Sequence, residues 1–211
     1  MNAIIGIMTR LPEPGRVKTR LIPALGPEGA CQVHCHLLRA TLTAARATGL
    51  PVELFITGNG RLAPEWSSEG ERVHRQVTGG LGRRMQHALA RLHARAPRAL
   101  LVGSDCPELS PDYLLRAAGM LGDRDFVLGP AVDGGYVLLG SARPSFWTAE
   151  ERLGGVALGT DRALEDTARV LEPAGSVGRL PPVLRDLDEP ADLMAIFSSG
   201  EISEILNRKE S

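Results

Sequence analysis

The sequence has no excess of charge of either sign and no long hydrophobic run. Its 24 lysines and arginines are balanced by 25 acidic residues, which gives a formal net charge of −1. Domains that bind nucleic acid usually carry a clear basic excess. A membrane-spanning helix needs about 20 consecutive apolar residues, and no stretch of the chain approaches that length. We therefore expect no nucleic-acid partner and no membrane association, so any bound anion has to meet local positive charge.

Cysteine and aromatic residues are also scarce. Three cysteines, an odd number in 211 residues, do not indicate a disulfide framework. The first apolar stretch, residues 3–8, is too short for a signal peptide and lacks the basic segment that precedes one, so we expect a cytoplasmic protein. Aromatic residues make up only 4% of the chain, which offers no obvious stacking platform by which to name a nucleotide base.

Apolar segments alternate with segments of helical periodicity along most of the chain. This alternation predicts one α/β domain over residues 1–211, with a mainly parallel, mixed sheet and helices on both faces. Two strands, 125–132 and 135–141, are joined by so short a link that they cannot form a βαβ unit, so their pairing is expected to be mixed or antiparallel. The other expected strands are 3–8, 52–57, 72–77, 99–102 and 182–185. The expected helices are 27–48, 81–96, 111–121, 161–171, one that begins near Pro190, and a short one after Ser198 with a frayed, charged end.

The loop after the first strand concentrates positive charge where ligands of open α/β sheets bind, at the carboxyl ends of the strands. Within LPEPGRVKTRL, Gly15 lets the main chain approach a ligand closely, and the basic side chains can bond phosphate. The loop is not a Walker motif, because it lacks the Gly-Lys-Ser/Thr ending. A solvated basic loop is the alternative interpretation. The candidate phosphate-binding residues are Gly15, Arg16, Lys18 and Arg20.

Acidic residues follow three other strands and should meet the basic loop at the same edge of the sheet. Carboxylates there can hold a hard divalent cation, Mg²⁺ or Mn²⁺, that also binds phosphate oxygens. Asp105 follows the strand 99–102, Asp133 precedes a glycine pair, and Asp186 and Asp188 share one face of an extended segment. Each position has a structural alternative: a turn or helix N-cap for Asp105, a tight turn for Asp133, and capping of the helix that begins near Pro190 for Asp188.

Three further patterns are interpreted as structural. In CQVHCH, residues 31–36, the two cysteines continue a helical stripe of apolar residues, so we favour core packing over a metal site. Cys106 has no identifiable histidine or acidic partner that would make it a nucleophile. The segment GGLG lacks the preceding strand of a dinucleotide fingerprint, and the arginines of the helix that follows favour a solvated face. Arg83 is the exception, because it lies in the first turn near the strand ends.

Five motifs, taken together and in order, resemble a known family. They are LPEPGRVKTRL, GGLGRRMQHAL, LLVGSDCPELSPDYL, VLGPAVDGGYVLLG and RDLDEPADL, and the resemblance covers about residues 3–197. The family is a bacterial group of GT-A-like transferases described as nucleotide-diphospho-sugar transferase-like. It is related to phospholactate guanylyltransferase and to the molybdenum cofactor guanylyltransferase. The resemblance implies a GT-A fold, a Rossmann-like three-layer α/β/α sandwich with a mainly parallel, mixed sheet that binds a nucleotide and a divalent metal.

The resemblance also implies roles by position. Asp105 would hold the metal together with Asp188 or its neighbour Asp186, and the first loop would hold phosphates. Lys18, Asp105 and Asp133 are the candidate catalytic residues. Further positions are implied by the motifs: Gly82 and Arg83 would border the nucleotide site, and Asp133, Gly134, Gly135 and Tyr136 would face the acceptor or the sugar.

Two positions depart from the family pattern, and they bear on the substrate. Arg10 stands where the family usually has lysine, and Leu158 stands where a tryptophan is expected, in the region of the acceptor pocket. The expected partners are a nucleotide donor and a small-molecule acceptor.

Three functions fit the candidate site. The family description favours glycosyl transfer from a nucleotide-diphospho-sugar. The strongly basic first loop favours the alternative, nucleotidyl transfer from a nucleoside triphosphate to a phosphorylated small molecule, because a triphosphate carries more charge. A non-catalytic nucleotide-binding module is the third interpretation. Against it stands the presence of carboxylates at all three candidate positions.

Overall fold

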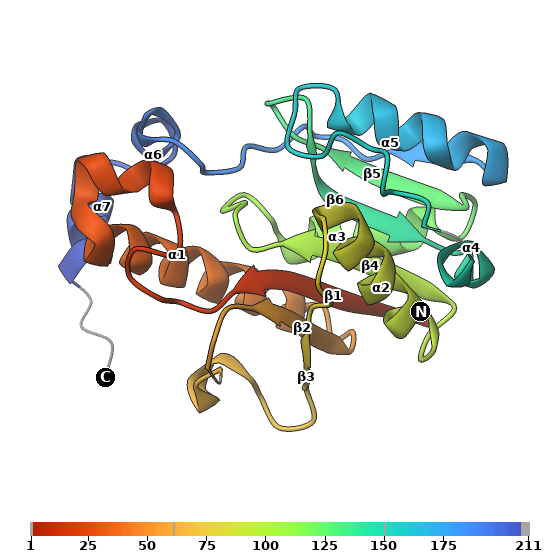
Figure 1. Cartoon of the computed structure of the whole chain (residues 1–211), viewed down its shortest axis with the longest axis horizontal. Coiled ribbons are helices and arrows are strands. Elements are labelled where there is room, and N and C mark those ends of the chain that lie inside the picture. Colours follow the sequence, from red (N-terminus) through yellow and green to blue (C-terminus); the bar gives the residue numbers. More distant parts are fainter. Residues whose placement is uncertain (1, 61, 150, 208–211) are drawn as a thin grey trace.

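A seven-stranded mixed sheet forms the centre of the computed structural model, which describes residues 2–60, 62–149 and 151–207 (Figure 1). The strands lie in the order β3-β2-β1-β4-β6-β5-β7. β6 runs antiparallel to both of its neighbours, and all other neighbouring pairs are parallel. The strands are β1 (Ala3–Arg10), β2 (Val52–Thr57), β3 (Arg72–Arg75), β4 (Arg98–Gly103), β5 (Phe126–Pro130), β6 (Tyr136–Ser141) and β7 (Val177–Arg179).

Helices cover both faces of this sheet. Because side chains alternate along a strand, Ile5 and Ile7 pack with α1 and α3 on one face, while Ile4 packs with α2 and α5 on the other. The predicted three-layer α/β/α fold with a mainly parallel, mixed sheet is therefore confirmed. The helices of the two outer layers are α1 (Ile22–Ala47), α3 (Pro111–Met120), α2 (Leu81–His93), α4 (Pro144–Thr148) and α5 (Ala163–Leu171). Two further helices, α6 (Pro190–Ile196) and α7 (Ser199–Asn207), share a small apolar cluster with α1.

Several segments differ from the sequence-based expectations. The predicted strand 182–185 is wrong: only an isolated bridge between Ala131 and Leu184 forms there, and the last strand is β7 instead. Pro182 supplies no backbone N–H for a ladder. The first helix begins at Ile22 and is kinked at Gly26, where φ is +71°, so the expected start at Pro27 is where the helix resumes. The short helix α4 was not predicted, and the expected frayed end lies outside the described residues.

The pairing of β5 and β6 agrees with the prediction from their short link. The two strands are antiparallel, and the link brings Asp133 and the glycine pair to the same edge as the ends of β1 and β4. In the parallel pairs, Arg10 lies opposite Thr57 and Met8 lies opposite Gly103. The residues that follow β1, β2 and β4 therefore emerge together at one edge of the sheet.

The helices and cysteines of the described chain bear on two further expectations. No described helix is both long and apolar enough to cross a membrane. All three cysteines lie in the described residues, and none of them forms a disulfide. Cys31 and Cys35 are buried on α1 together with Leu38 and Leu42, as the helical stripe predicts.

Candidate functional site

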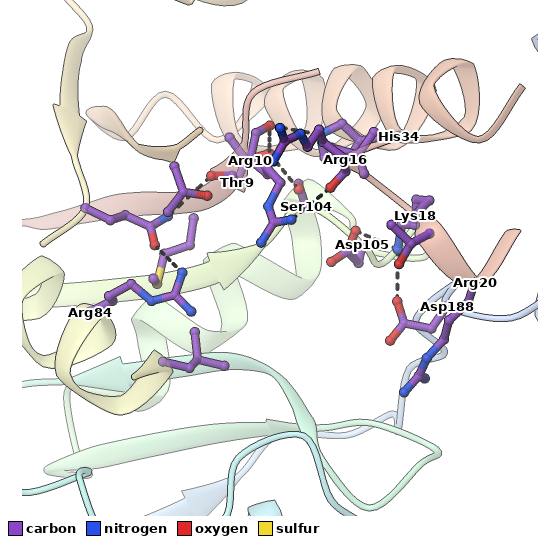
Figure 2. Close-up of a pocket in the computed structure, with 16 residues that line it drawn as sticks. Thr9, Arg10, Arg16, Lys18, Arg20, His34, Arg84, Ser104, Asp105 and Asp188 are labelled. Atoms are coloured by element: carbon purple, nitrogen blue, oxygen red, sulfur yellow. Dashed lines mark hydrogen bonds and ion pairs between the residues drawn. The ribbon is translucent and has the colours of Figure 1, made fainter. Parts of the chain in front are cut away.

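Lys18 is the central side chain of the site. It follows β1 in the basic loop, and its backbone adopts the left-handed conformation with φ +44° and ψ +45°, which non-glycine residues rarely adopt. Its side chain is only 5% exposed, and its ammonium group contacts Asp105 Oδ1 at 2.7 Å and Asp188 Oδ1 at 3.0 Å (Figure 2). The ammonium also donates to the main-chain oxygen of Leu187. Lys18 thus joins three segments that are far apart in the sequence.

The charges around Lys18 account for the stability of its buried ammonium. Burial on its own lowers the pKa of Lys18, because it disfavours the charged form. The charges of Asp105 and Asp188, and their hydrogen bonds to the ammonium, outweigh burial and raise the pKa above its usual value. Lys18 therefore remains positively charged at neutral pH, and the interpretation of this residue as part of a solvated loop is wrong.

Neither Asp105 nor Asp188 is a helix N-cap, the structural alternative that sequence analysis left open for both. Ser110 caps α3, where its hydroxyl accepts a hydrogen bond from the backbone N–H of Tyr113 at 3.2 Å. Glu189 is the N-cap of α6 and forms a reciprocal capping box with Asp192. The carboxylates of Asp105 and Asp188 contact Lys18 instead, and their side chains are 46% and 48% exposed.

A basic cavity of about 320 Å³ lies beside Lys18, at the ends of β1 and β4 (Figure 2). Arg10 and Arg84 face it from β1 and from α2, and burial together with the charge of Arg10 lowers the pKa of Arg84. Positive charge that is crowded in this way favours binding of an anion. The cationic side chains on the wall are Arg10, Arg16, Lys18, Arg20 and Arg84.

Hydrogen bonds shape the wall of the basic cavity. Thr9 and Ser104, both buried, share a hydroxyl–hydroxyl hydrogen bond of 2.9 Å that ties β1 to the end of β4. His34 Nε2 donates to the main-chain oxygen of Arg10 at 2.9 Å, and burial lowers the pKa of His34, which favours the neutral ring. Gln76 donates to the main-chain oxygen of Phe55 and accepts from Arg84.

Among the polar residues of this wall, sequence reasoning missed Thr9, His34, Thr57, Gln76 and Arg84. None of them belongs to the charged motifs at the strand ends. Arg84 adjoins Arg83, which sequence analysis chose instead, in the first turn of the same helix. His34 lay inside the stretch that was assigned to the core.

A second cavity of about 300 Å³ adjoins the first, and Met8, Leu81, Asp105 and Asp188 line both. Its walls are mainly apolar, with Met85, Leu101, Val137 and Leu138 among the lining side chains. The predicted acceptor residues Asp133, Gly135 and Tyr136 line it, and so do Asp186 and Leu158, the position that departs from the family pattern. All charged side chains on the described wall of this second cavity are aspartates, so we call it the acidic cavity. The basic and the acidic cavity lie side by side, with the carboxylates of Asp105 and Asp188 at their junction.

The acidic side chains of the second cavity interact with one another. Burial, followed by the charges of Asp133 and Asp188, raises the pKa of Asp186 to about 6. Asp133 also forms the turn that sequence analysis offered as its alternative role, because its Oδ1 accepts from the backbone N–H of Gly135 at 2.8 Å.

The donor chemistry fits a hard divalent cation. Carboxylate oxygens are the preferred ligands of Mg²⁺ and Mn²⁺, and a cation would relieve the repulsion from Asp133 and Asp188 that adds to burial in raising the pKa of Asp186. Asp105 would hold it together with Asp188, or with Asp186 in place of Asp188. Within residues 2–60, 62–149 and 151–207, however, no three acidic, histidine or cysteine side chains are grouped closely enough to hold one ion, and Lys18 bridges two of these carboxylates.

The remaining predicted residues have different surroundings. Gly15 is exposed with φ +77°, a conformation that favours glycine. Gly82 and Arg83 line neither cavity, and a Cβ at Gly82 would lie 2.3 Å from the main-chain oxygen of Leu153, so this glycine allows close packing of α2. Gly134 has the same kind of role, since its Cβ would lie 2.1 Å from the main-chain oxygen of Asp161.

Cys106 lines the second cavity, although its side chain is buried. Burial raises the pKa of its thiol to about 12, so the thiolate is not formed near neutral pH. Cys106 therefore packs as an apolar residue rather than acting as a nucleophile.

Comparison with known proteins identifies a family and a fold. A family model described as an uncharacterized protein conserved in bacteria, DUF2064, matches residues 40–160. No curated protein matches the chain. A structure from Desulfovibrio desulfuricans G20, which carries the provisional name nucleotide-diphospho-sugar transferase, is similar with a TM-score of 0.81 at 24% identity, covering 98% of this chain and 97% of that one.

Two further solved structures share the fold at lower similarity. Rv0371c of Mycobacterium tuberculosis H37Rv, in complex with manganese, gives a TM-score of 0.57 at 18% identity, with 99% of this chain and 100% of that chain covered. The 2-C-methyl-D-erythritol 4-phosphate cytidylyltransferase of Thermus thermophilus gives 0.56 at 16% identity, with 92% and 96% covered. At these identities the likeness establishes the fold.

Proposed function

The chain belongs to the DUF2064 family, and from its site we propose that it is a metal-dependent transferase that uses a nucleotide donor, with glycosyl transfer from a nucleotide-diphospho-sugar as its reaction. One observation carries the proposal: a basic cavity and an acidic cavity meet at Asp105 and Asp188. The diphosphate would lie in the basic cavity, where cationic side chains offset its charge. The sugar would lie at the junction, where carboxylates accept hydrogen bonds from its hydroxyl groups.

The residues of the chain would act on the donor through charge and position. Lys18 and Arg84 would neutralise the diphosphate as its negative charge grows on departure. When bound by Asp105 and Asp188, a divalent cation would supply further positive charge to the phosphate oxygens. The acceptor oxygen would form a bond to the anomeric carbon while the bond from that carbon to the phosphate oxygen breaks. The electron pair would leave with the nucleoside diphosphate, and Asp133 would take the proton of the acceptor hydroxyl.

Nucleotidyl transfer is the second candidate, because five cationic side chains surround the basic cavity and a triphosphate carries more charge than a diphosphate. Its usual acceptor would be a phosphorylated molecule, which needs positive charge on the far side of the junction. The described residues that line the second cavity include no lysine, arginine or histidine. This contrast supports glycosyl transfer as the first candidate.

A thermal-shift comparison tests the donor directly. Nucleoside triphosphates and nucleotide-diphospho-sugars are compared with and without Mn²⁺, because a ligand of the native state raises its melting temperature. We expect a manganese-dependent rise with at least one nucleotide-diphospho-sugar, and its loss in Arg84→Gln. Arg169→Gln is the matched control, since Arg169 is exposed on α5 and pairs only locally with Asp166. A response to triphosphates alone would replace glycosyl by nucleotidyl transfer, and no response to either would refute the proposal.

A further inference from the structure

The charged residues that line the second cavity are all acidic. Among the described residues of its wall, the charged side chains are Asp105, Asp133, Asp186 and Asp188. The adjoining basic cavity has four arginines and Lys18 on its wall. The two halves of the site therefore select for opposite charges, and a single ligand class does not suit both.

The negative charge of the second cavity is only partly offset. Lys18 pairs with Asp105 and Asp188 at 2.7 and 3.0 Å and so reduces the net charge of the junction. Asp133 and Asp186 form no ion pair with another described residue, and both line the second cavity without lining the first. A phosphate or carboxylate group beside them would meet two carboxylates that have no cation paired with them, although the charge of Lys18 partly offsets that of Asp186.

The apolar side chains of the cavity add a second requirement. Leu101 and Leu138 reach it from the neighbouring strands β4 and β6, Met85 from α2, and Leu158 from the loop before α5. Apolar walls favour a ligand that buries apolar surface, whereas a fully hydroxylated ligand would leave its hydroxyl groups without partners there. Leu158 is half-buried and lies in a loop, so the size and charge of this side chain can be changed without altering a strand or helix.

We propose that the second cavity binds the acceptor, and that the acceptor is an amphipathic alcohol or amine that carries no phosphate or carboxylate group. That this ligand is the acceptor rests on the proposed function, but the chemical class of the ligand follows from the cavity itself. The hydroxyl or amine group faces Asp133 and Asp186, and the apolar part contacts Leu158 and the walls formed by β4 and β6. In the transfer step, the attacking atom is the oxygen of the alcohol, or the nitrogen of an amine whose ammonium form has first given one proton to solvent. It forms the bond to the anomeric carbon and loses its proton to Asp133, while the bond from that carbon to the phosphate oxygen breaks and the electron pair leaves with the nucleoside diphosphate.

Three compounds that differ only in one group test this chemistry. They are 3-phenylpropan-1-ol, 3-phenylpropylamine and 3-phenylpropyl phosphate, which share the apolar part and carry a neutral, a positive and a negative group. Each is titrated into the full-length protein while the backbone amide signals are followed by NMR. The amides of Gly135 and Gly159 report the second cavity, and those of Arg16 and Thr19 report the basic cavity.

We expect the amine and the alcohol to shift the Gly135 and Gly159 signals with an affinity at least about tenfold higher than that of the phosphate. The phosphate should shift the Arg16 and Thr19 signals instead. Leu158→Lys should reverse the order at Gly135 and Gly159, and Leu158→Trp, which fills the cavity, should weaken all three compounds there. Leu81→Ala is not a suitable control, because that residue lines both cavities. Val183→Lys is the matched control, since Val183 is exposed and lines neither cavity.

Two outcomes would overturn the inference. One is a phosphate that binds at Gly135 and Gly159 as tightly as the alcohol. The other is the absence of any shift at these glycines up to the solubility limit of all three compounds. Neither outcome depends on the variants, so a variant that does not fold leaves the test intact. Failure of the proposed function appears separately, as the absence of any response of the Arg16 and Thr19 signals to nucleotide donors.

Discussion

Replacing Lys18 by methionine would test whether this buried ammonium holds the site together. Methionine keeps the length of the side chain and removes its charge and its donors. The hydrogen bond to Leu187 contributes about 1 kcal/mol. The side chains of Asp105 and Asp188 are 46% and 48% exposed, so water screens both ion pairs and each contributes about 0.5 kcal/mol. We therefore expect Lys18→Met to lower the free energy of unfolding by about 2 kcal/mol.

The assay is equilibrium unfolding in urea, with Arg20→Met as the matched control. Arg20 belongs to the same loop, but its contact with Glu189 is 3.6 Å long and both side chains are more than 60% exposed. A pair of this kind contributes less than about 0.5 kcal/mol, so the control should remain close to the wild type. The loss of about 2 kcal/mol in Lys18→Met corresponds to a melting temperature lower by about 4–8 °C in a protein of this size.

The pH dependence provides an independent check of the same reasoning. The pKa of Lys18 is raised in the folded state above its usual value of 10.5, so the folded protein holds this proton more tightly than the unfolded chain. Its contribution to stability is fully present below pH 10.5 and is lost as the pH rises through the folded pKa. Lys18→Met should lack this alkaline loss. If the wild type and Lys18→Met have equal stabilities at pH 7 and the same profile above pH 10, the assignment of a charged, paired Lys18 is refuted.

Three further predictions concern other parts of the site. Asp105→Asn should lower manganese-dependent donor turnover by about 100-fold or more while the circular dichroism spectrum is unchanged. Near-normal turnover would contradict the proposal that Asp105 holds the metal. Gly82→Ala should cost about 1–3 kcal/mol in urea unfolding, because its Cβ would lie 2.3 Å from the main-chain oxygen of Leu153, whereas Gly119→Ala, in open space on α3, should be neutral or stabilising. Because the pKa of Asp186 is raised to about 6, the folded protein holds this proton more tightly than the unfolded chain, so the metal-free wild type should lose stability as the pH rises from about 4 to 6. Asp186→Asn should abolish this dependence of stability on pH. An unchanged dependence in the variant would contradict the raised pKa of Asp186.

Much of the sheet could be predicted because its strands are continuous apolar runs that end at polar residues. The segment 52–57 was predicted with the bounds that the structure gives to β2. Strand β7 was missed because it has only three residues, Val177–Arg179, with a glycine in the middle, and its partner β5 supplies the context that the local sequence lacks. The segment 182–185 has more apolar residues than β7, yet only Leu184 forms a bridge, because edge pairing depends on the neighbouring strand rather than on local pattern.

The candidate site was predictable where chemistry coincides with a strand end. Asp105 and Asp133 lie just after the ends of β4 and β5, and Lys18 lies in the loop after β1. The rule that ligands bind at the carboxyl ends of strands places the three together. The choice between Arg83 and Arg84 could not be made from the sequence, because it depends on the rotation of α2 against the sheet. Of these two arginines, Arg84 lines the basic cavity and Arg83 does not. The acidic cavity was harder still, since its wall combines residues from β1, β4, β6, α2, α5 and four loops.

The segment that carries Asp186 and Asp188 has no strand of its own, so its position depends on a few long-range contacts. Leu184 bridges to Ala131, and the backbone N–H of Leu187 donates to the main-chain oxygen of Asp105 at 2.9 Å. Lys18 adds the contacts to Leu187 and Asp188. The residue that contributes positive charge to the basic cavity therefore also positions two carboxylates of the acidic cavity. A change at Lys18 should consequently alter ligand binding in both cavities, whereas a change at Arg84 or Leu158 should alter binding in only one.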